Sequence, residues 1–252
     1  MGLKGSIKGP IKRIISLVPS ITQTLYDLGL ENKVVGITAY CPKGDPSLPK
    51  ISLGGTKKVS LERVKEAQPD IILGNKEENT KEDYLKLSKN WPVWMSDVDN
   101  CLDSLKMIEM LGELFSAEKE AFMFLEKITK GLSETQNTFN ASLAYLIWKK
   151  PDMAAGSHTY IDSVLSHLGF RNVFEDRKRY PEISLSTLKE KKPDAILLPD
   201  EPYRFTEKEA SFFQKELPKS KILLVKGEPF TWHGTSMSMA IDYFKGPFKA
   251  LF

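Results

Sequence analysis

Residues 59–73 (VSLERVKEAQPDIIL) and 183–197 (ISLSTLKEKKPDAIL) are near copies of one another. Each copy has the pattern of a short amphipathic helix, a Pro-Asp break and an apolar β-strand. Two copies are too few for a solenoid, in which many repeats stack on one another. The repeat therefore predicts two related lobes with a ligand cleft between them.

The composition is that of an ordinary globular protein. Of the 252 residues, 41% are hydrophobic and 27% are charged, which is enough for two lobes with real cores. The net charge of +3 is spread along the chain, so we expect no nucleic-acid partner. We interpret the basic start (Lys4, Lys8, Lys12 and Arg13) as a solvated arm. No apolar run approaches the roughly 18 residues that span a bilayer, so we expect no membrane insertion.

The first part of the chain alternates strands with helices. Residues 13–18 predict a buried strand, and Ser20 is expected to cap a helix that ends at Leu28-Gly29. Further strands are predicted at 34–38, 71–73 and 92–95, with a helix at 61–67. This alternation is typical of parallel βαβ units, so the predicted fold class is α/β.

Two helices, opened by Asn100 and Ser116, follow the first lobe. The second keeps its apolar residues at helical spacing and is expected to be the long rigid connector. The second half then repeats the plan, with a strand at 143–147 and a helix from Ser157 to Leu168-Gly169. The predicted domains are an N-terminal α/β lobe at 1–115, a connecting helix at 116–137 and a C-terminal α/β lobe at 138–252.

Several short motifs add to the repeat. They are RIISLVPS at 13–20, Leu28-Gly29, Gly54-Gly-Thr56, Leu61-Glu-Arg63, Pro69-Asp70 and Pro193-Asp194. In order and spacing the chain resembles, from Lys12 onward, the class III solute-binding proteins of ABC importers, which include cobalamin and ferric-siderophore binders. The resemblance implies a periplasmic binding protein whose lobes, joined by one rigid helix, hold an organic metal complex in their cleft without catalysis.

The resemblance also implies ligand contacts. Tyr40 and Tyr180 match aromatic residues of the two lobes in the cobalamin binder, and residues 227–233 fall where the family places another cleft loop. Phe230 and Trp232 in that loop offer flat apolar faces to a corrinoid or an aromatic siderophore. The alternative is that these rings cap the cores. Trp148 ends a predicted strand near the expected mouth of the cleft.

Polar ligand contacts are expected at five further positions. His158 and His233 are candidates for a polar contact, for metal ligation or for a structural role. No metal site is predicted, because the first half of the chain has no histidine to share one. Asn75 is a candidate for a polar edge of the ligand or part of a solvated loop. Arg179 and Arg204 are suited to a carboxylate or phosphate.

The resemblance implies docking on an ABC permease through one glutamate per lobe. Glu62 matches the first, whereas Ser186 stands at the equivalent place in the second repeat. We expect no leader in this sequence, because glycine and lysine residues interrupt any apolar run before Ile14, and the two cysteines, Cys41 and Cys101, fit a reducing compartment. A periplasmic location is thus implied by resemblance, and a cytoplasmic one if the sequence is native and full length. A leaderless cytoplasmic carrier or sensor is one alternative function.

Catalysis is not predicted. The sequence has no nucleophile elbow, phosphate-binding glycine loop, zinc-protease motif or Cys-x-x-Cys. A chelatase-like tetrapyrrole enzyme that acts through His158 or His233 is the other alternative, because a related fold serves metal-inserting chelatases. Otherwise we expect no catalytic residue and no resident cofactor. The expected partners are a small metal complex and an ABC permease, with the chain itself a monomer.

Overall fold

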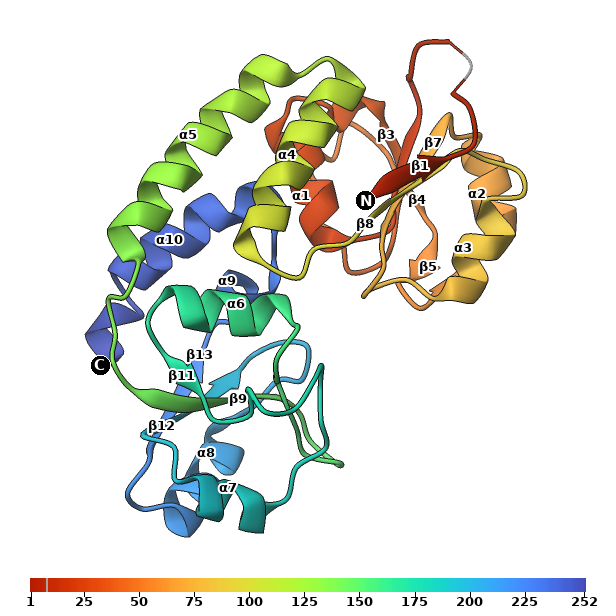
Figure 1. The fold of residues 1–252 in the computed structure, drawn as a ribbon. Helices are drawn as coiled ribbons and strands as arrows, with labels where there is room; N and C mark the ends of the chain where they lie inside the picture. The colour runs from red at the N-terminus through yellow and green to blue at the C-terminus, as the bar shows by residue number, and fades with distance from the viewer. Residues whose placement is uncertain (8) are drawn as a thin grey trace. The chain divides into compact units, whose positions relative to one another are not determined.

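A computed structural model describes residues 1–7 and 9–252, and the chain forms two compact units (Figure 1). Lys8, counted above in the basic start, lies outside the described residues. Unit 1 comprises Met1–Val98, Leu102–Glu126 and His233–Ser236, and unit 2 comprises Asp99–Cys101, Lys127–Trp232 and Met237–Phe252. Within the part of the chain that the structure describes, no helix combines the length and apolarity needed to cross a membrane.

Unit 1 is built on a six-stranded sheet in the order β1-β8-β7-β2-β3-β4. Its strands are β1 (Gly2–Lys4), β2 (Ile14–Ser16), β3 (Val34–Ile37), β4 (Ile51–Ser52), β7 (Ile71–Asn75) and β8 (Val93–Ser96), and β5 (Gly54–Gly55) pairs with β6 (Lys58–Val59) as a separate hairpin. All neighbours in the large sheet are parallel except β1, which runs antiparallel to β8. The expected solvated arm is therefore wrong for its first residues, since Lys4 belongs to an edge strand.

Helices cover both faces of this sheet. In Figure 1, α1 (Pro19–Asp27) and α4 (Cys101–Phe115) lie against one face, and α2 (Leu61–Ala67) and α3 (Lys81–Leu87) against the other. The central strands are accordingly apolar on both sides, with their isoleucines fully buried. This three-layer arrangement explains why β2 and β7 appear in the sequence as continuous apolar runs rather than alternating ones.

Helix α1 begins earlier than expected. Its N-cap is Val18, and Pro19 occupies the first helical position, where a missing amide hydrogen has no cost. Ser20 therefore lies inside the helix and is not the cap that the sequence predicts. The helix ends before Leu28, and Gly29 follows with φ +74°, a left-handed conformation that favours glycine.

The connecting helix α5 spans Glu118–Thr135, two residues shorter at each end than the predicted 116–137. Ser116 has a φ of +54° and lies in the link from α4 to α5. The boundary between the two units falls inside this helix, between Glu126 and Lys127.

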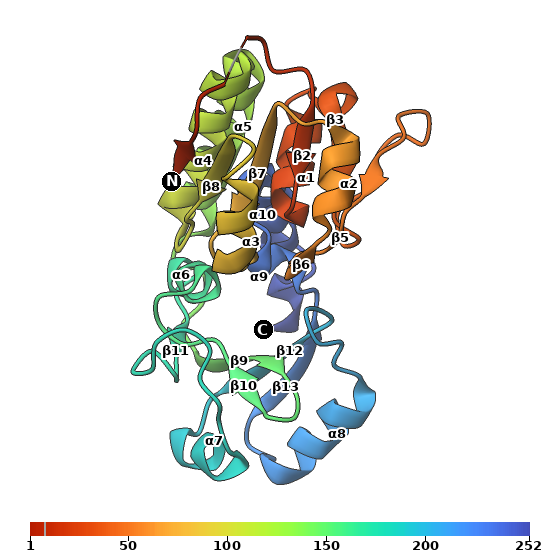
Figure 2. The ribbon, with the colours of Figure 1, turned by 90° about the vertical axis from the view of Figure 1, so that its right-hand side faces the viewer.

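Unit 2 repeats the parallel core of unit 1 (Figure 2). Its strands are β9 (Ser142–Trp148), β10 (Met153–Ala154), β11 (Arg171–Asn172), β12 (Ala195–Pro199) and β13 (Lys221–Val225). The order β11-β9-β12-β13 is parallel throughout and matches β3-β2-β7-β8, while β10 pairs antiparallel with the end of β9. Its helices are α6 (Tyr160–His167), α7 (Leu185–Lys191), α8 (Glu207–Glu216), α9 (Glu228–Thr231) and α10 (Met237–Lys245).

The sequence repeat corresponds to equivalent elements. Helices α2 and α7 each begin at a serine, Ser60 or Ser184, whose side chain accepts the amide hydrogen of the third helical residue. Each ends at a residue in left-handed conformation, Gln68 or Lys192. The two helices therefore begin and end in the same way although their surfaces differ.

The Pro-Asp step has the same structural role in both copies. Asp70 Oδ2 accepts hydrogen bonds from the backbone amides of Lys12 and Arg13, at 2.7 and 2.8 Å. Asp194 Oδ2 accepts them from the amide and the hydroxyl of Ser142, both at 2.7 Å. Each carboxylate therefore holds the segment between the helix and the following strand, β7 or β12, against the start of the central strand, β2 or β9. This explains why the Pro-Asp step occurs in both copies of the repeat.

Candidate functional site

Open α/β sheets bind ligands at the carboxyl ends of their parallel strands. In unit 1 the loops after β3, β7 and β8 lie at this edge, and in unit 2 the loops after β9, β12 and β13 do so. Most of the sequence-predicted ligand residues follow one of these strands, so they can be placed unit by unit.

Tyr40 is the most exposed candidate in unit 1. It follows β3 and is 71% exposed, the second highest value among the large hydrophobic side chains that the structure describes. Behind the ring lies the β5–β6 hairpin, because a β-carbon at Gly55 would stand 3.8 Å from the Tyr40 ring. The backbone joins the hairpin too, as the Ala39 amide donates to the Gly54 carbonyl at 2.8 Å. The ring is thus supported from one side and open to solvent on the rest.

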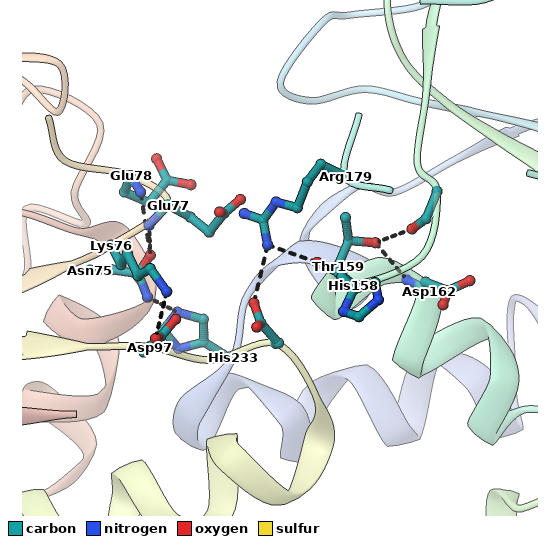
Figure 3. Close-up of polar contacts among 12 residues, drawn as sticks. Asn75, Lys76, Glu77, Glu78, Asp97, His158, Thr159, Asp162, Arg179 and His233 are labelled. Carbon is teal, nitrogen blue, oxygen red and sulfur yellow. Dashed lines mark hydrogen bonds and ion pairs between the residues drawn. The ribbon is translucent and has the colours of Figure 1, made fainter. Parts of the chain in front are cut away.

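Asn75 does not lie in a solvated loop, as one alternative had it, but is the last residue of β7 and is buried. Its side-chain oxygen accepts from the amides of Glu77 and Glu78, at 2.8 and 3.3 Å. Its amide group donates to Ser96 Oγ at 2.9 Å. Figure 3 shows the contacts with Glu77 and Glu78, which hold the turn against the end of the strand. Asn75 therefore shapes the turn that carries the two glutamates.

His233 is buried beside Asn75, with 6% of its surface exposed (Figure 3). Its Nε2 lies 3.5 Å from Asn75 Nδ2 and 3.4 Å from Ser20 Oγ. Burial lowers the pKa of the imidazole to about 4, so the ring is neutral at pH 7. The side-chain NH2 group of Asn75 can only donate a hydrogen bond, so Nε2 of His233 has to accept it. The neutral ring therefore carries its proton on Nδ1. This burial favours the structural role over a direct contact with a ligand.

The structure gives no support to direct metal ligation by these histidines. Across residues 1–7 and 9–252, no three histidine, cysteine or acidic side chains gather in a way that would hold a metal ion. Asp97, which follows β8 near this turn, forms an ion pair with Lys76 at 2.8 Å.

Arg179 and His158 lie together in unit 2. The Arg179 guanidinium forms an ion pair with Asp99 at 3.3 Å and donates to the His158 carbonyl at 2.7 Å (Figure 3). Both residues have left-handed backbone conformation, with φ of +64° and +59°. The His158 side chain is exposed, whereas the arginine is held by these contacts. Arg179 thus orders the loop before α6 in addition to any contact with a ligand.

Tyr180 is half-buried and lies next to this arginine. The Arg179 guanidinium carbon is 5.8 Å from the centre of the Tyr180 ring, within the range of a cation–π contact. One part of the ring surface is therefore used within unit 2, and another part stays exposed.

Trp232 follows α9 and is half-buried. Its side chain hydrogen-bonds to Glu201, which also accepts from Thr231 Oγ1 at 3.0 Å. Burial raises the pKa of Glu201, and nearby Glu228 adds to the rise. The carboxylate fits only because residue 227 is glycine, since a β-carbon there would meet Glu201 Cγ at 2.4 Å. Glu201 thus anchors the indole at the end of β12.

Trp148 ends β9 and is 42% exposed. Tyr203 packs edge-on against it, with ring centres 5.7 Å apart, and Phe205 continues the row at 4.8 Å from Tyr203. Arg204, between these two, is exposed. Sequence reasoning missed Tyr203 and Glu201. The signal that would have found them is their position directly after the apolar run of β12.

Phe230 does not offer a face to a ligand, contrary to the sequence-based expectation. It is fully buried. Its ring packs between Tyr145, Phe244 and Phe248, with centre distances of 5.1 to 5.3 Å. The expectation failed because α9 turns this side chain inward while the neighbouring Trp232 reaches the surface.

The proposed docking positions occupy equivalent places in the two units. Glu62 lies in the first turn of α2 and is exposed. Ser186 lies in the first turn of α7, also exposed, and its hydroxyl is 2.7 Å from Ser184 Oγ. The two positions are therefore equivalent, but the one in unit 2 carries no charge.

The two cysteines are both buried and free of disulfides. Burial raises the pKa of each thiol, which disfavours the reactive thiolate. The Cys41 sulfur lies 3.1 Å from Thr38 Oγ1. These thiols have the surroundings of structural residues.

Comparison with known proteins gives a consistent picture. The family model described as periplasmic binding protein matches residues 14–223. An uncharacterized ABC transporter substrate-binding lipoprotein of Bacillus subtilis, YvrC, is 27% identical over 209 residues, or 77% of this chain and 66% of the relative. The vitamin B12-binding protein of Vibrio parahaemolyticus is 25% identical over 195 residues, or 74% of this chain and 70% of the relative. The chain thus spans slightly less than two thirds of the Bacillus relative.

Solved structures share the fold. The periplasmic vitamin B12 binding protein BtuF of Vibrio cholerae superposes with a TM-score of 0.79 at 19% identity, covering 96% of this chain and 98% of that one. A protein of an ABC-type Fe3+-hydroxamate transport system from Saccharomonospora viridis gives a TM-score of 0.74 at 20% identity, covering 95% and 94%. These similarities confirm the predicted α/β fold class with two related lobes.

Proposed function

Because the chain belongs to the periplasmic binding protein family, we propose that it is the substrate-binding component of an ABC importer. We further propose that it binds an organic metal complex, a corrinoid or a ferric siderophore. The relatives named for ABC transport and for vitamin B12 binding support this proposal, and they give the chelatase-like alternative no support. The proposed action is capture and presentation, so no catalytic residue, resident cofactor or bare-metal site is part of it.

The observation that carries the proposal is the exposure of Tyr40. A large aromatic ring on a loop rich in proline and glycine, supported by a hairpin and otherwise open, has little packing role to fill. It lies after the carboxyl end of a parallel strand, where α/β folds bind ligands. Flat rings of this kind suit a corrin or an aromatic siderophore.

Unit 2 supplies the other proposed contacts. Trp148, Tyr180 and Trp232 each keep part of their ring exposed near the ends of its strands or in the adjoining loops. The exposed side chains of His158 and Arg204 are proposed for polar groups of the ligand, with Arg179 ordering their loop. Asn75 and His233 are proposed to support the unit 1 turn from behind rather than to touch the ligand.

We propose that the chain docks on its permease through Glu62 and works as a monomer in the periplasm. The exposed position of Glu62 in the first turn of α2 supports the docking role. Because Ser186 supplies no charge at the equivalent place, the docking force is expected to come mainly from unit 1.

The test is a calorimetric titration with cyanocobalamin, ferrichrome, ferrioxamine B and haem. One-to-one saturable binding of cyanocobalamin or a ferric siderophore, with loss of affinity on Tyr40→Ala, would support the proposal. A protein shown to be folded by circular dichroism that binds none of the four would overturn the ligand class. Turnover of a tetrapyrrole with Fe²⁺ or Co²⁺ would overturn the proposed binding role.

A further inference from the structure

Unit 1 contains a cavity of about 490 Å³ that the proposed function does not use. Strand β1, the turn between β7 and α3, the helix α3 and the end of β8 together form its walls. Its volume falls within the roughly 300–1,000 Å³ that small-molecule sites occupy. The cavity belongs to unit 1 alone, and a third of its lining residues, Met1 to Lys4, are held there by the pairing of β1 with β8.

The floor of the cavity is polar, but its polar groups already have partners. Ser96 Oγ accepts from Asn75 Nδ2 at 2.9 Å and donates to the Gly74 carbonyl at 3.3 Å. The side-chain oxygen of Asn79 accepts a hydrogen bond from the backbone amide of Asn75 at 2.9 Å, and its NH2 group donates to the Thr56 carbonyl at 3.0 Å. A ligand would therefore not be recognised mainly through hydrogen bonds to this floor.

Positive charge dominates the rim. Lys4, Lys76 and Lys81 line the cavity, and Asp97 is the one acidic residue among the lining residues that the structure describes. Asp97 forms its ion pair with Lys76. The ammonium groups of Lys4 and Lys81 then contribute surplus positive charge to the rim.

The walls supply apolar surface beside these charges. Tyr84 and Met95 line the cavity together with Leu3, and the Lys4 ammonium lies 5.5 Å from the centre of the Tyr84 ring. A negatively charged group on a flat apolar body would meet both features at once, because the Lys4 ammonium lies next to the ring and Lys81 lines the same cavity.

We propose that this cavity is a second binding site, for a small organic anion in which a carboxylate or phosphate is carried on a flat apolar body. The anion lies at Lys4 and Lys81, and the body packs on Tyr84 and Met95. The proposed import function does not require this site, so either of the two proposals can be wrong while the other is right.

In unit 2, the helix α8 and the strand β13, which correspond to α3 and β8, also line a cavity. The cavity between α8 and β13 has a volume of about 440 Å³ and includes one lysine, Lys215, and one glutamate, Glu207, among its lining residues. It therefore has no surplus charge, and no strand equivalent to β1 pairs with β13 among the described residues. The anion site is expected in unit 1 only.

The test compares 1-naphthoate with its neutral isostere 1-naphthamide by calorimetry at low ionic strength. We expect saturable binding of naphthoate and about tenfold weaker binding of naphthamide, since two exposed charge contacts together are worth about this factor. Amide shifts in ¹H–¹⁵N spectra should map naphthoate to Gly2, Tyr84 and Ser96. Added salt should reduce the difference in affinity between naphthoate and naphthamide, because it screens the charge contacts.

The double variant Lys4→Gln/Lys81→Gln should weaken naphthoate about tenfold and leave naphthamide within twofold. Lys86→Gln/Lys89→Gln, on and just after the same helix but outside the cavity lining, is the matched control and should change neither. Tyr84→Ala should weaken both ligands, with folding of every variant checked by circular dichroism. Equal binding of the two ligands, equal loss in both double variants, or shifts confined to residues outside the cavity would each overturn the proposal.

Discussion

The two units share a parallel four-strand core but differ in what surrounds it. In both, an aspartate after a proline ties the crossover to the central strand, and a serine-capped helix precedes that step. Unit 1 adds β1 to its edge and places an exposed tyrosine after β3, whereas unit 2 adds β10 and a row of aromatic residues after β9 and β12. The repeat therefore preserves the scaffold and varies the strand ends, where loops can change without disturbing the core.

The largest expected effect concerns the core of unit 2. Phe230→Ala removes a fully buried ring and should lower the free energy of unfolding by about 3–5 kcal/mol. Hydrogen exchange should rise in β9 and β12 and stay unchanged in β2 and β7, so that the loss is assigned to one unit.

The matched control is Phe212→Ala, which removes an exposed ring from α8 in the same unit. It should change the stability by less than about 1 kcal/mol. If Phe230→Ala instead left stability intact and abolished ligand binding, the sequence-based interpretation of Phe230 as a ligand contact would be restored.

The next largest effect is a pH dependence of stability that arises from His233 in unit 1. The folded-state pKa of His233 is about 4, against 6.5 in the unfolded chain, so the unfolded state binds more protons between these values. Stability should rise as the pH increases from 4 to 6.5 and be level above it, and this residue contributes about 3 kcal/mol of the change. Urea titrations of the wild type and of His233→Gln should differ in this slope.

His167 in unit 2 gives the matched comparison, because burial also lowers its pKa but to a lesser degree. His167→Gln should remove a smaller part of the slope, and hydrogen exchange should assign that part to unit 2. A His233→Gln protein with the slope of the wild type would show that burial does not lower the pKa of this imidazole in the folded state.

The sequence predicted most of what is local. The α2 boundaries, the Pro-Asp step and the apolar runs of β2 and β7 follow from propensity, capping and periodicity, and the structure confirms them. Strand β1 was missed because a segment rich in glycine and lysine has no strand propensity, and only its pairing with the distant β8 makes it extended.

The site was harder to predict for the same reason. Phe230 in α9 and Trp232 just after it are two positions apart, and only packing against Tyr145 and Phe248 decides which ring is buried. Asn75 and His233 are 158 residues apart, so no local pattern shows that they meet in unit 1. Exposure of Tyr40, by contrast, agreed with its proline- and glycine-rich surroundings.

The aromatic residues at the strand ends allow the ligand contacts of the two units to be compared. Tyr180→Ala/Trp232→Ala should weaken the ligand identified by titration at least tenfold, and Tyr40→Ala should do so severalfold, because each ring loses stacking worth about 1 kcal/mol. Thermal unfolding should change little for Tyr40→Ala. Phe122→Ala on α5, an exposed ring away from the strand ends, is the control and should bind normally. Full affinity in the double variant would remove unit 2 from the proposed site.

The shared aspartates should give smaller and nearly equal effects. Asp194→Ala removes two hydrogen bonds to Ser142, and Asp70→Ala removes two to Lys12 and Arg13, so each should cost about 1 kcal/mol at these solvated positions. Increased exchange should be confined to the unit that carries the change. The hydrogen bonds to Ser142 hold the pKa of Asp194 below its usual value, so its contribution is present near neutral pH and is lost as acid protonates the folded-state carboxylate. If either aspartate variant increased hydrogen exchange equally in both units, the two aspartates would not stabilise their own units separately.

The smallest expected effect concerns the position at which the repeats differ in charge. With a vitamin B12 importer permease in nanodiscs as the probe, Glu62→Ala should weaken capture of the ligand-loaded protein, since it removes the one acidic docking residue proposed. Ser186→Glu should strengthen capture about threefold, the gain of a single exposed ion pair. Ser211→Glu, an exposed change on α8 with the same charge, is the control and should leave capture unchanged. If Ser186→Glu had no effect while Glu62→Ala did, unit 2 would contact the permease through a different surface, and the loss of its glutamate would be part of a rearranged interface. If neither changed capture, the charge at the start of α2 would be a feature of the helix alone, because an acidic residue in a first turn is already favoured by the helix dipole.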